Sequence, residues 1–171
     1  MRKLILILLA AVLILPAAAR AGLASPGDGS LVVSGADGKL TAHGKGLIFG
    51  HLDHGTITVV DYNPDSNTAL PSVSGAKLKL VGGRVVYSGN DVRFLFPGGR
   101  YTLIVEGTGI AISAVGNGKF TALGAGTNND GSFTVDGSHA QEIGTTGTII
   151  YGKGNSGDSG SSNSSSRGKS G

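Results

Sequence analysis

Residues 75–124 read GAKLKLVGGRVVYSGNDVRFLFPGGRYTLIVEGTGIAISAVGNGKFTALG, a series of six short apolar-rich runs. Breakers that contain glycine separate the runs; they are Gly82-Gly83, Gly89-Asn90, Pro97-Gly98-Gly99, Gly107-Thr108-Gly109 and Gly116-Asn117-Gly118. Glycine supplies the positive φ angles that tight hairpin turns need. Links this short join antiparallel strands, because a parallel crossover needs a dozen or more residues. The stretch therefore predicts an antiparallel β-meander.

Apolar and polar residues alternate within these runs, as they do along strands with one buried face. The predicted inward residues are Leu78, Leu80, Val92, Phe94, Phe96, Tyr101, Leu103 and Val105. Similar runs on either side bring the total to about ten short strands. The sequence predicts an all-β fold, a mostly antiparallel meander that forms a sandwich or a partly closed barrel. A β-solenoid is the second interpretation, because runs that begin at regular intervals also match stacked coils.

The N-terminal residues match a secretory signal peptide. Arg2 and Lys3 precede an unbroken apolar run at residues 4–15, and small residues follow it. The expected cleavage site lies after Ala19 or Ala21. The apolar run is shorter than the ~20 residues that a membrane-spanning helix needs, so we expect no stable transmembrane anchor after cleavage. The chain is expected to be secreted or to reside in the cell envelope.

The net charge of the cleaved chain is close to zero, although the whole chain is basic. The 171 residues contain 14 Lys and Arg against 11 Asp and Glu. Arg2, Lys3 and Arg20 lie in the leader, so 11 of the 14 basic residues remain to balance the 11 acidic ones. A general polyanion-binding role loses its support, and we expect no nucleic-acid partner. The chain has no cysteine, which excludes disulfides, thiolate metal sites and a thiol nucleophile.

Composition divides the chain into three parts. Residues 1–21 form the leader, residues 22–151 are expected to form a single all-β domain, and residues 152–171 consist mainly of Gly, Ser and Asn. A segment with that composition cannot bury enough apolar area to offset the entropy lost on ordering. The last part is therefore expected to be a disordered tail or tether.

Residues 61–74 form the one long irregular connection that the sequence predicts within the domain. Oxygen-bearing side chains occupy every second position at its start: Asp61, Asn63, Asp65 and Asn67. Calcium loops present carboxylates and amides with this spacing. The EF-hand pattern is incomplete, because Ser66 stands in place of the turn glycine and Ser72 in place of the closing glutamate. An ordinary surface loop is the alternative, since Asn, Asp and Pro are common turn residues.

A second candidate metal site combines His43, His51, Asp53 and His54. Imidazole and carboxylate groups of this kind hold zinc or copper when the fold brings them together. Three of the four fall in a predicted turn, where a one-residue change of register would separate them. Exposed turn histidines are the alternative interpretation.

No arrangement of residues typical of an enzyme is present in the sequence. No serine lies in a Gly-x-Ser-x-Gly elbow, and Glu106 and Glu142 have no obvious partner carboxylate for glycoside hydrolysis. The basic residues of the meander are candidates for a cationic strip that meets cell-wall polymers or acidic glycans: Lys77, Lys79, Arg84, Arg93 and Arg100. Alternatively, such lysines only prevent edge-to-edge pairing of strands.

The sequence predicts the function in outline only. We expect a non-catalytic exported domain with a structural or adhesive role at the cell envelope or outside the cell. Its expected partner is an envelope polymer or another envelope protein. The alternative is a ligand-binding module that holds calcium at the long loop or a glycan on a polar face of the sheet. A secreted hydrolase ranks last.

Overall fold

The computed structural model describes residues 27–124, 131–144 and 146–152, and these residues form seven strands. The strands are β1 (Gly29–Asn63), β2 (Ser72–Val81), β3 (Arg84–Phe96), β4 (Arg100–Gly124), β5 (Ser132–Val135), β6 (Gln141–Glu142) and β7 (Thr146–Tyr151). Every pairing between them is antiparallel. The all-β antiparallel prediction is confirmed. The strands are fewer and longer than expected, since β1 has 35 residues and β4 has 25.

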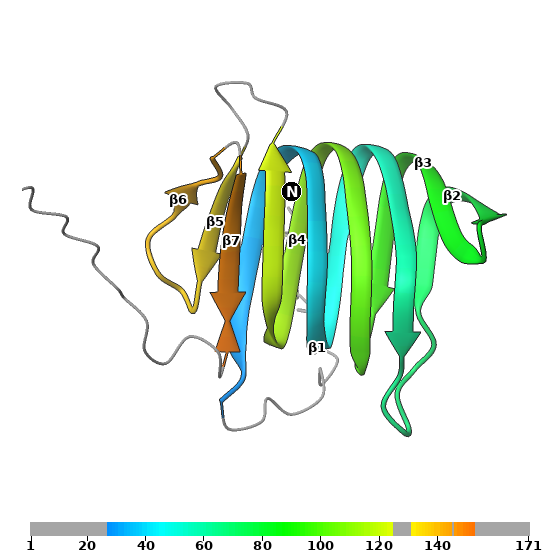
Figure 1. Cartoon of the computed structure of the whole chain (residues 1–171), viewed down its shortest axis with the longest axis horizontal. Coiled ribbons are helices and arrows are strands. Elements are labelled where there is room, and N and C mark those ends of the chain that lie inside the picture. Colours follow the sequence, from blue (N-terminus) through cyan, green and yellow to red (C-terminus); the bar gives the residue numbers. More distant parts are fainter. Residues whose placement is uncertain (1–26, 125–130, 145, 153–171) are drawn as a thin grey trace, which may run out of the picture.

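The two long strands wind around each other as a coil (Figure 1). Thr41 of β1 pairs with Ile104 on one side and with Thr121 on the other. Both partners belong to β4 and lie 17 positions apart, which gives the length of one turn. Further along β1, β3 replaces β4 as the partner on one side while β4 remains on the other, and β2 pairs with β3 as the last strand. The coil is thus one antiparallel ribbon with its tip at the β2–β3 turn.

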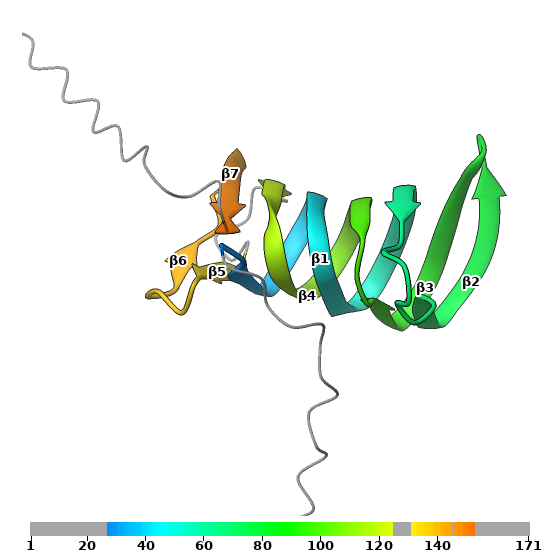
Figure 2. The same cartoon turned by 90° about the horizontal axis from the view of Figure 1, so that it is seen from below.

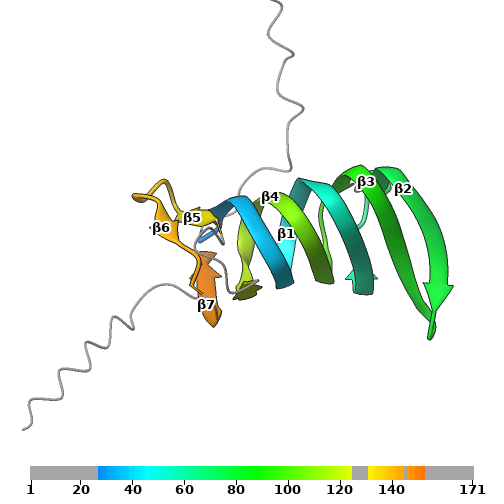
Figure 3. The same ribbon diagram turned by 90° about the horizontal axis from the view of Figure 1, so that it is seen from above.

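Each turn of the coil passes through two layers, which we call the front sheet and the back sheet after the view in Figure 1. The front sheet contains residues 38–45 and 55–63 of β1, residues 100–107 and 117–124 of β4, and β7. The back sheet contains residues 29–36 and 46–54 of β1, residues 110–116 of β4, and β5. Views from below and above place β7 and β5 on opposite sides of the coil (Figure 2 and Figure 3). The fold is sandwich-like and is not closed into a barrel.

The hydrophobic core fills the space between the two sheets. Every second residue of the ribbon points inward, so that Tyr101, Leu103 and Val105 of the front sheet are buried, as are Ile110 and Ile112 of the back sheet. The predicted inward face of β3 is buried as well, with Val92, Phe94 and Phe96 exposing between 0% and 4% of their surface. The period of two therefore predicted the core of these strands correctly.

Two rows of glycines mark the edges where the ribbon bends from one sheet to the other. Consecutive cross-strand partners in the upper glycine row are Gly124, Gly38, Gly107, Gly55 and Gly89. The lower glycine row contains Gly29, Gly116 and Gly46, which are also consecutive cross-strand partners. Gly46 and Gly116 have φ angles of 126° and 139°, and a Cβ on either would overlap a carbonyl oxygen of the neighbouring strand. We call each segment of the ribbon that crosses one of the two sheets a pass. Successive passes approach closely at the bends because the glycine positions carry no side chain.

The predicted meander is wrong in one respect, because most glycine breakers bend the ribbon instead of reversing it. Residues 107–109 and 116–118 lie inside β4, which continues through both. Only the Gly82-Gly83 breaker forms a two-residue hairpin turn, between β2 and β3. The β-solenoid interpretation agrees with the coil in that segments stack along one axis. It differs in that a solenoid has parallel neighbouring strands, whereas the neighbouring strands here are antiparallel.

The described chain enters and leaves the coil at the same end. A Cβ on Gly29 at the start of β1 would overlap the backbone of Gly152, the residue that follows β7. The β2–β3 hairpin lies at the opposite end of the long axis (Figure 1). The predicted leader and the tail beyond residue 152 lie outside the described residues. Among the residues that the structure describes, no helix is long and apolar enough to cross a membrane.

Candidate functional site

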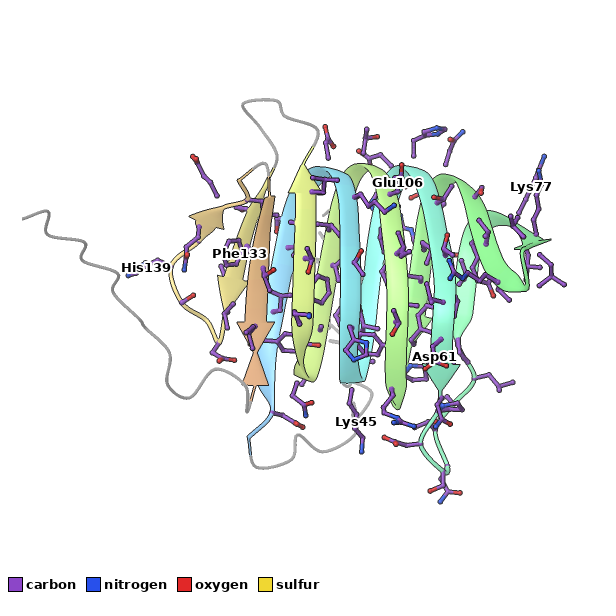
Figure 4. All side chains as sticks on the ribbon, in the orientation of Figure 1. Lys45, Asp61, Lys77, Glu106, Phe133 and His139 are labelled. Carbon is purple, nitrogen blue, oxygen red and sulfur yellow. The ribbon has the colours of Figure 1, made fainter. Side chains whose placement is uncertain are left out.

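The front sheet carries a shallow hollow of about 600 Å³ at its lower edge. Five neighbouring passes contribute to it: β7, residues 117–119 of β4, residues 43–45 of β1, residues 100–102 of β4, and Asp61 near the end of β1. Figure 4 shows Lys45 at the lower edge of the front sheet and Asp61 beside it along the coil. The charged side chains around the hollow are exposed, whereas Tyr101 and Tyr151, which also line it, are buried.

The hollow gathers cationic side chains by cross-strand pairing. Lys45 lies opposite Arg100, and His43 lies opposite Lys119. Lys45 has an ion pair with Asp65 at 3.8 Å, and His43 Nδ1 shares a hydrogen bond of 2.8 Å with Thr102 Oγ1. Lys45 and Arg100 are thus like charges placed directly opposite each other on a sheet, which is destabilising. The hollow therefore concentrates positive charge at a cost in stability.

Arg100 and Lys119 are the cations of this hollow that remain available. Within the described ranges neither side chain has an ion-pair or hydrogen-bond partner. Both residues are exposed. Among the described residues, Asp61 is the one carboxylate that lines the hollow, and it lies opposite Thr102.

A buried pair of tyrosines supports the floor of the hollow. Tyr101 Oη and Tyr151 Oη share a hydrogen bond of 2.5 Å inside the coil. Gly44 and Gly118 pair beside them, and a Cβ on Gly44 would lie 3.0 Å from the Tyr101 hydroxyl. Burial raises the pKa of both phenols above the usual value, and the Tyr151 charge adds to the rise for Tyr101. The missing side chains at Gly44 and Gly118 therefore make room for the tyrosine pair.

The predicted calcium-binding residues lie at and after the end of β1. Asp61 lines the hollow, Asn63 ends the strand, and Asn67 has a left-handed φ of 69° in the loop that follows. The Asp65 carbonyl accepts hydrogen bonds from the backbone and hydroxyl of Thr68, and its carboxylate lies near the Lys45 ammonium. The loop thus has the features of an ordinary Asx-rich turn, and calcium binding there stays a prediction.

The structure does not bring the four residues of the second candidate metal site together. His43 lies on the front sheet, whereas His51 and Asp53 lie on the back sheet and His54 follows at the upper bend. His54 Nδ1 shares a hydrogen bond with Asn90 Oδ1 at 2.5 Å. In the part of the chain that the structure describes, no group of three or more His, Cys, Asp or Glu side chains is arranged to hold a metal ion.

His51 instead belongs to a small charged cluster on the outer side of the back sheet. Its Nε2 lies 2.8 Å from Asp91 Oδ1 and 3.7 Å from Asp53 Oδ1, and Arg93 approaches Asp91 to 3.2 Å. The hydrogen bonds from His51 and then Arg93 hold the pKa of the exposed Asp91 carboxyl below its usual value. His51 and Arg93 thus both have Asp91 as a hydrogen-bond and ion-pair partner.

The predicted cationic strip is divided between the two faces of the coil. Arg93 lies on the back sheet opposite His51. Arg100 lies in the front hollow, whereas Lys77 and Lys79 lie on β2 at the far end of the coil, where Figure 4 shows Lys77. Sequence analysis did not single out Lys45 and Lys119 as basic partners. Their place beside Arg100 and His43 follows from the register of the coil, for which the sequence carries no local signal.

Comparison with protein-family models, with curated proteins and with solved structures finds no match to this chain.

Proposed function

We propose that this chain is an exported, non-catalytic β-domain with a structural or adhesive role at the cell envelope or outside the cell. The observation that carries the proposal is the placement of both ends of the domain at one end of the coil. A domain held in this way extends its two outer faces and its hairpin tip away from a single point of attachment. Such an arrangement suits a display or adhesive module.

The shape of the front face supports the same proposal. The hollow is shallow, open and spread over five passes. Enzyme sites usually bury most of a small substrate in a concave pocket that excludes water. An open face of this kind suits contact with an extended partner. The second candidate function, glycan binding, is favoured by the polar and cationic side chains of the hollow.

An epitope inserted between Gly82 and Gly83 would test the proposal. A Cβ on either glycine meets nothing within 4 Å, so the tip is expected to tolerate the insertion. In an exporting host, we expect the full-length chain to sediment with the envelope and to bind the antibody on intact cells. The same chain without residues 1–21 is the control, and it should be labelled only after permeabilisation. Labelling of the full-length chain only after permeabilisation would contradict the proposal. Release of all the protein without binding to envelopes would contradict a role at the envelope and leave only a role outside the cell.

A further inference from the structure

We propose that the front hollow binds an acidic polysaccharide, with the carboxylates of successive sugar acids held by Arg100 and Lys119. This inference deepens the adhesive role proposed above and rests on it. It shares only Arg100 with the cationic strip predicted from sequence, and it adds Lys119 from a neighbouring part of the front sheet.

Charge is the first argument. The coil places Lys45 opposite Arg100 and His43 opposite Lys119, and Asp65 pairs with Lys45 alone. Arg100 and Lys119 thus lack an anionic partner among the described residues. A guanidinium binds a carboxylate through two parallel hydrogen bonds, and such charge-assisted bonds are the strong ones. A bound sugar acid would relieve the repulsion between the cations that the register imposes.

The extent of the hollow argues for a polymer over a small ion. Its lining comes from five neighbouring passes, and strands lie about 4.8 Å apart, so the hollow runs about 19 Å across the sheet. A single carboxylate or phosphate would occupy a small part of that length. An extended chain that crosses the strands would reach Lys119 and Arg100 with separate charged groups.

The uncharged lining argues for sugars over other polyanions. Thr102 and Asn117 offer hydroxyl and amide groups, and the Asp61 carboxylate can accept hydrogen bonds from sugar hydroxyls, which a polyphosphate chain lacks. Ile150 is 43% exposed and offers an apolar contact to a sugar ring. Single-stranded nucleic acids are usually bound by stacking of bases on aromatic rings. The tyrosines of this hollow are buried and face the core.

Binding of the full chain to polygalacturonate at low salt tests the inference, with neutral dextran and linear polyphosphate as comparison polymers. We expect polygalacturonate to bind, dextran not to bind, and polyphosphate to bind more weakly. In the double variant Arg100→Gln/Lys119→Gln the affinity for polygalacturonate should fall about tenfold, because two charge-assisted contacts are lost. Added salt should weaken the binding of the unchanged chain. Lys77→Gln/Lys79→Gln is the matched control, since it removes the same charge from exposed positions of β2 and should change the affinity less than about twofold.

Three results would overturn the inference. The first is an equal loss of affinity in the Lys77/Lys79 control, which would mean that net charge alone governs binding. The second is equal binding of dextran. The third is tighter binding of polyphosphate than of polygalacturonate, which would make this a phosphate site. Envelope sedimentation of the Arg100→Gln/Lys119→Gln chain separates the two proposals. If that chain still sediments while it no longer binds polygalacturonate, the ligand site stands and attachment depends on another surface. If the unchanged chain binds polygalacturonate but never reaches the envelope, only the adhesive role fails.

Discussion

Gly46→Ala should lower the free energy of unfolding by about 3 kcal/mol, the sum of left-handed backbone strain and overpacking. Gly46 has a φ of 126°, and its Cβ would overlap the Val115 carbonyl of the adjacent pass. Gly116→Ala should cost as much, because its Cβ would overlap the Lys45 carbonyl from the other side. Chemical denaturation of the variants measures both values.

Two controls separate the causes of the loss. Gly35 has a φ of 66° but nothing within 4 Å of its Cβ position, so Gly35→Ala should cost only the backbone strain, about 1 kcal/mol. Gly144 has neither constraint, and Gly144→Ala should change the stability by less than about 0.5 kcal/mol. If Gly46→Ala were as mild as Gly144→Ala, the close packing of passes at the lower glycine row would be refuted.

We expect the protein to lose stability above about pH 10 because of the buried tyrosine pair. Burial raises the pKa of Tyr101 and of Tyr151 in the folded state, whereas a tyrosine in the unfolded chain ionises near 10. A raised pKa contributes stability that is complete below the unfolded pKa and is lost as the pH rises toward the folded one. Between its unfolded and its folded pKa, each tyrosine should therefore remove at most about 1.4 kcal/mol per pH unit. Denaturation curves between pH 8 and pH 11.5 measure this slope.

The double variant Tyr101→Phe/Tyr151→Phe is the control for the alkaline slope. It removes both hydroxyls of the shared hydrogen bond, so its stability at pH 7 should lie within about 1 kcal/mol of the unchanged chain. Lysines titrate in both proteins, and the difference between the two slopes isolates the tyrosines. Each single variant leaves one buried hydroxyl unsatisfied and should cost about 1–3 kcal/mol at neutral pH. Equal alkaline slopes in the unchanged chain and the double variant would contradict burial of the pair.

Local pattern predicted which residues of the ribbon point inward. Tyr101, Leu103 and Val105 occupy every second position of their run and are buried. Leu78 and Leu80 follow the same period but are 57% and 74% exposed. Leu78 lies opposite Tyr87, which packs against the core, yet no further pass covers the β2 edge. Periodicity therefore predicted correctly which side of the ribbon Leu78 and Leu80 occupy. They are nevertheless exposed because β2 is the last strand at its end of the coil.

The coil itself could not be predicted from the sequence, because a glycine pair has the same local signature at a turn and at a bend. Gly107 pairs with both Gly38 and Gly55, and these partners are supplied by distant parts of the chain. The candidate site has the same origin. Lys45 and Arg100 meet only through the register of two strands that are separated in sequence by the β2–β3 hairpin. The sequence identified Arg100 and Asp61 individually but could not place them in one hollow.

Cross-linking of paired cysteines tests the coil most directly, because the natural chain has no cysteine. Thr41 lies between Ile104 and Thr121 on the front sheet. The variants Thr41→Cys/Ile104→Cys and Thr41→Cys/Thr121→Cys should both be joined within one molecule by a short bifunctional thiol reagent. Thr41→Cys/Phe49→Cys is the control that should not react, because residue 49 points outward from the back sheet. A simple hairpin would give residue 41 only one of the two partners, so cross-linking of a single pair would contradict the coil and the front hollow built on it.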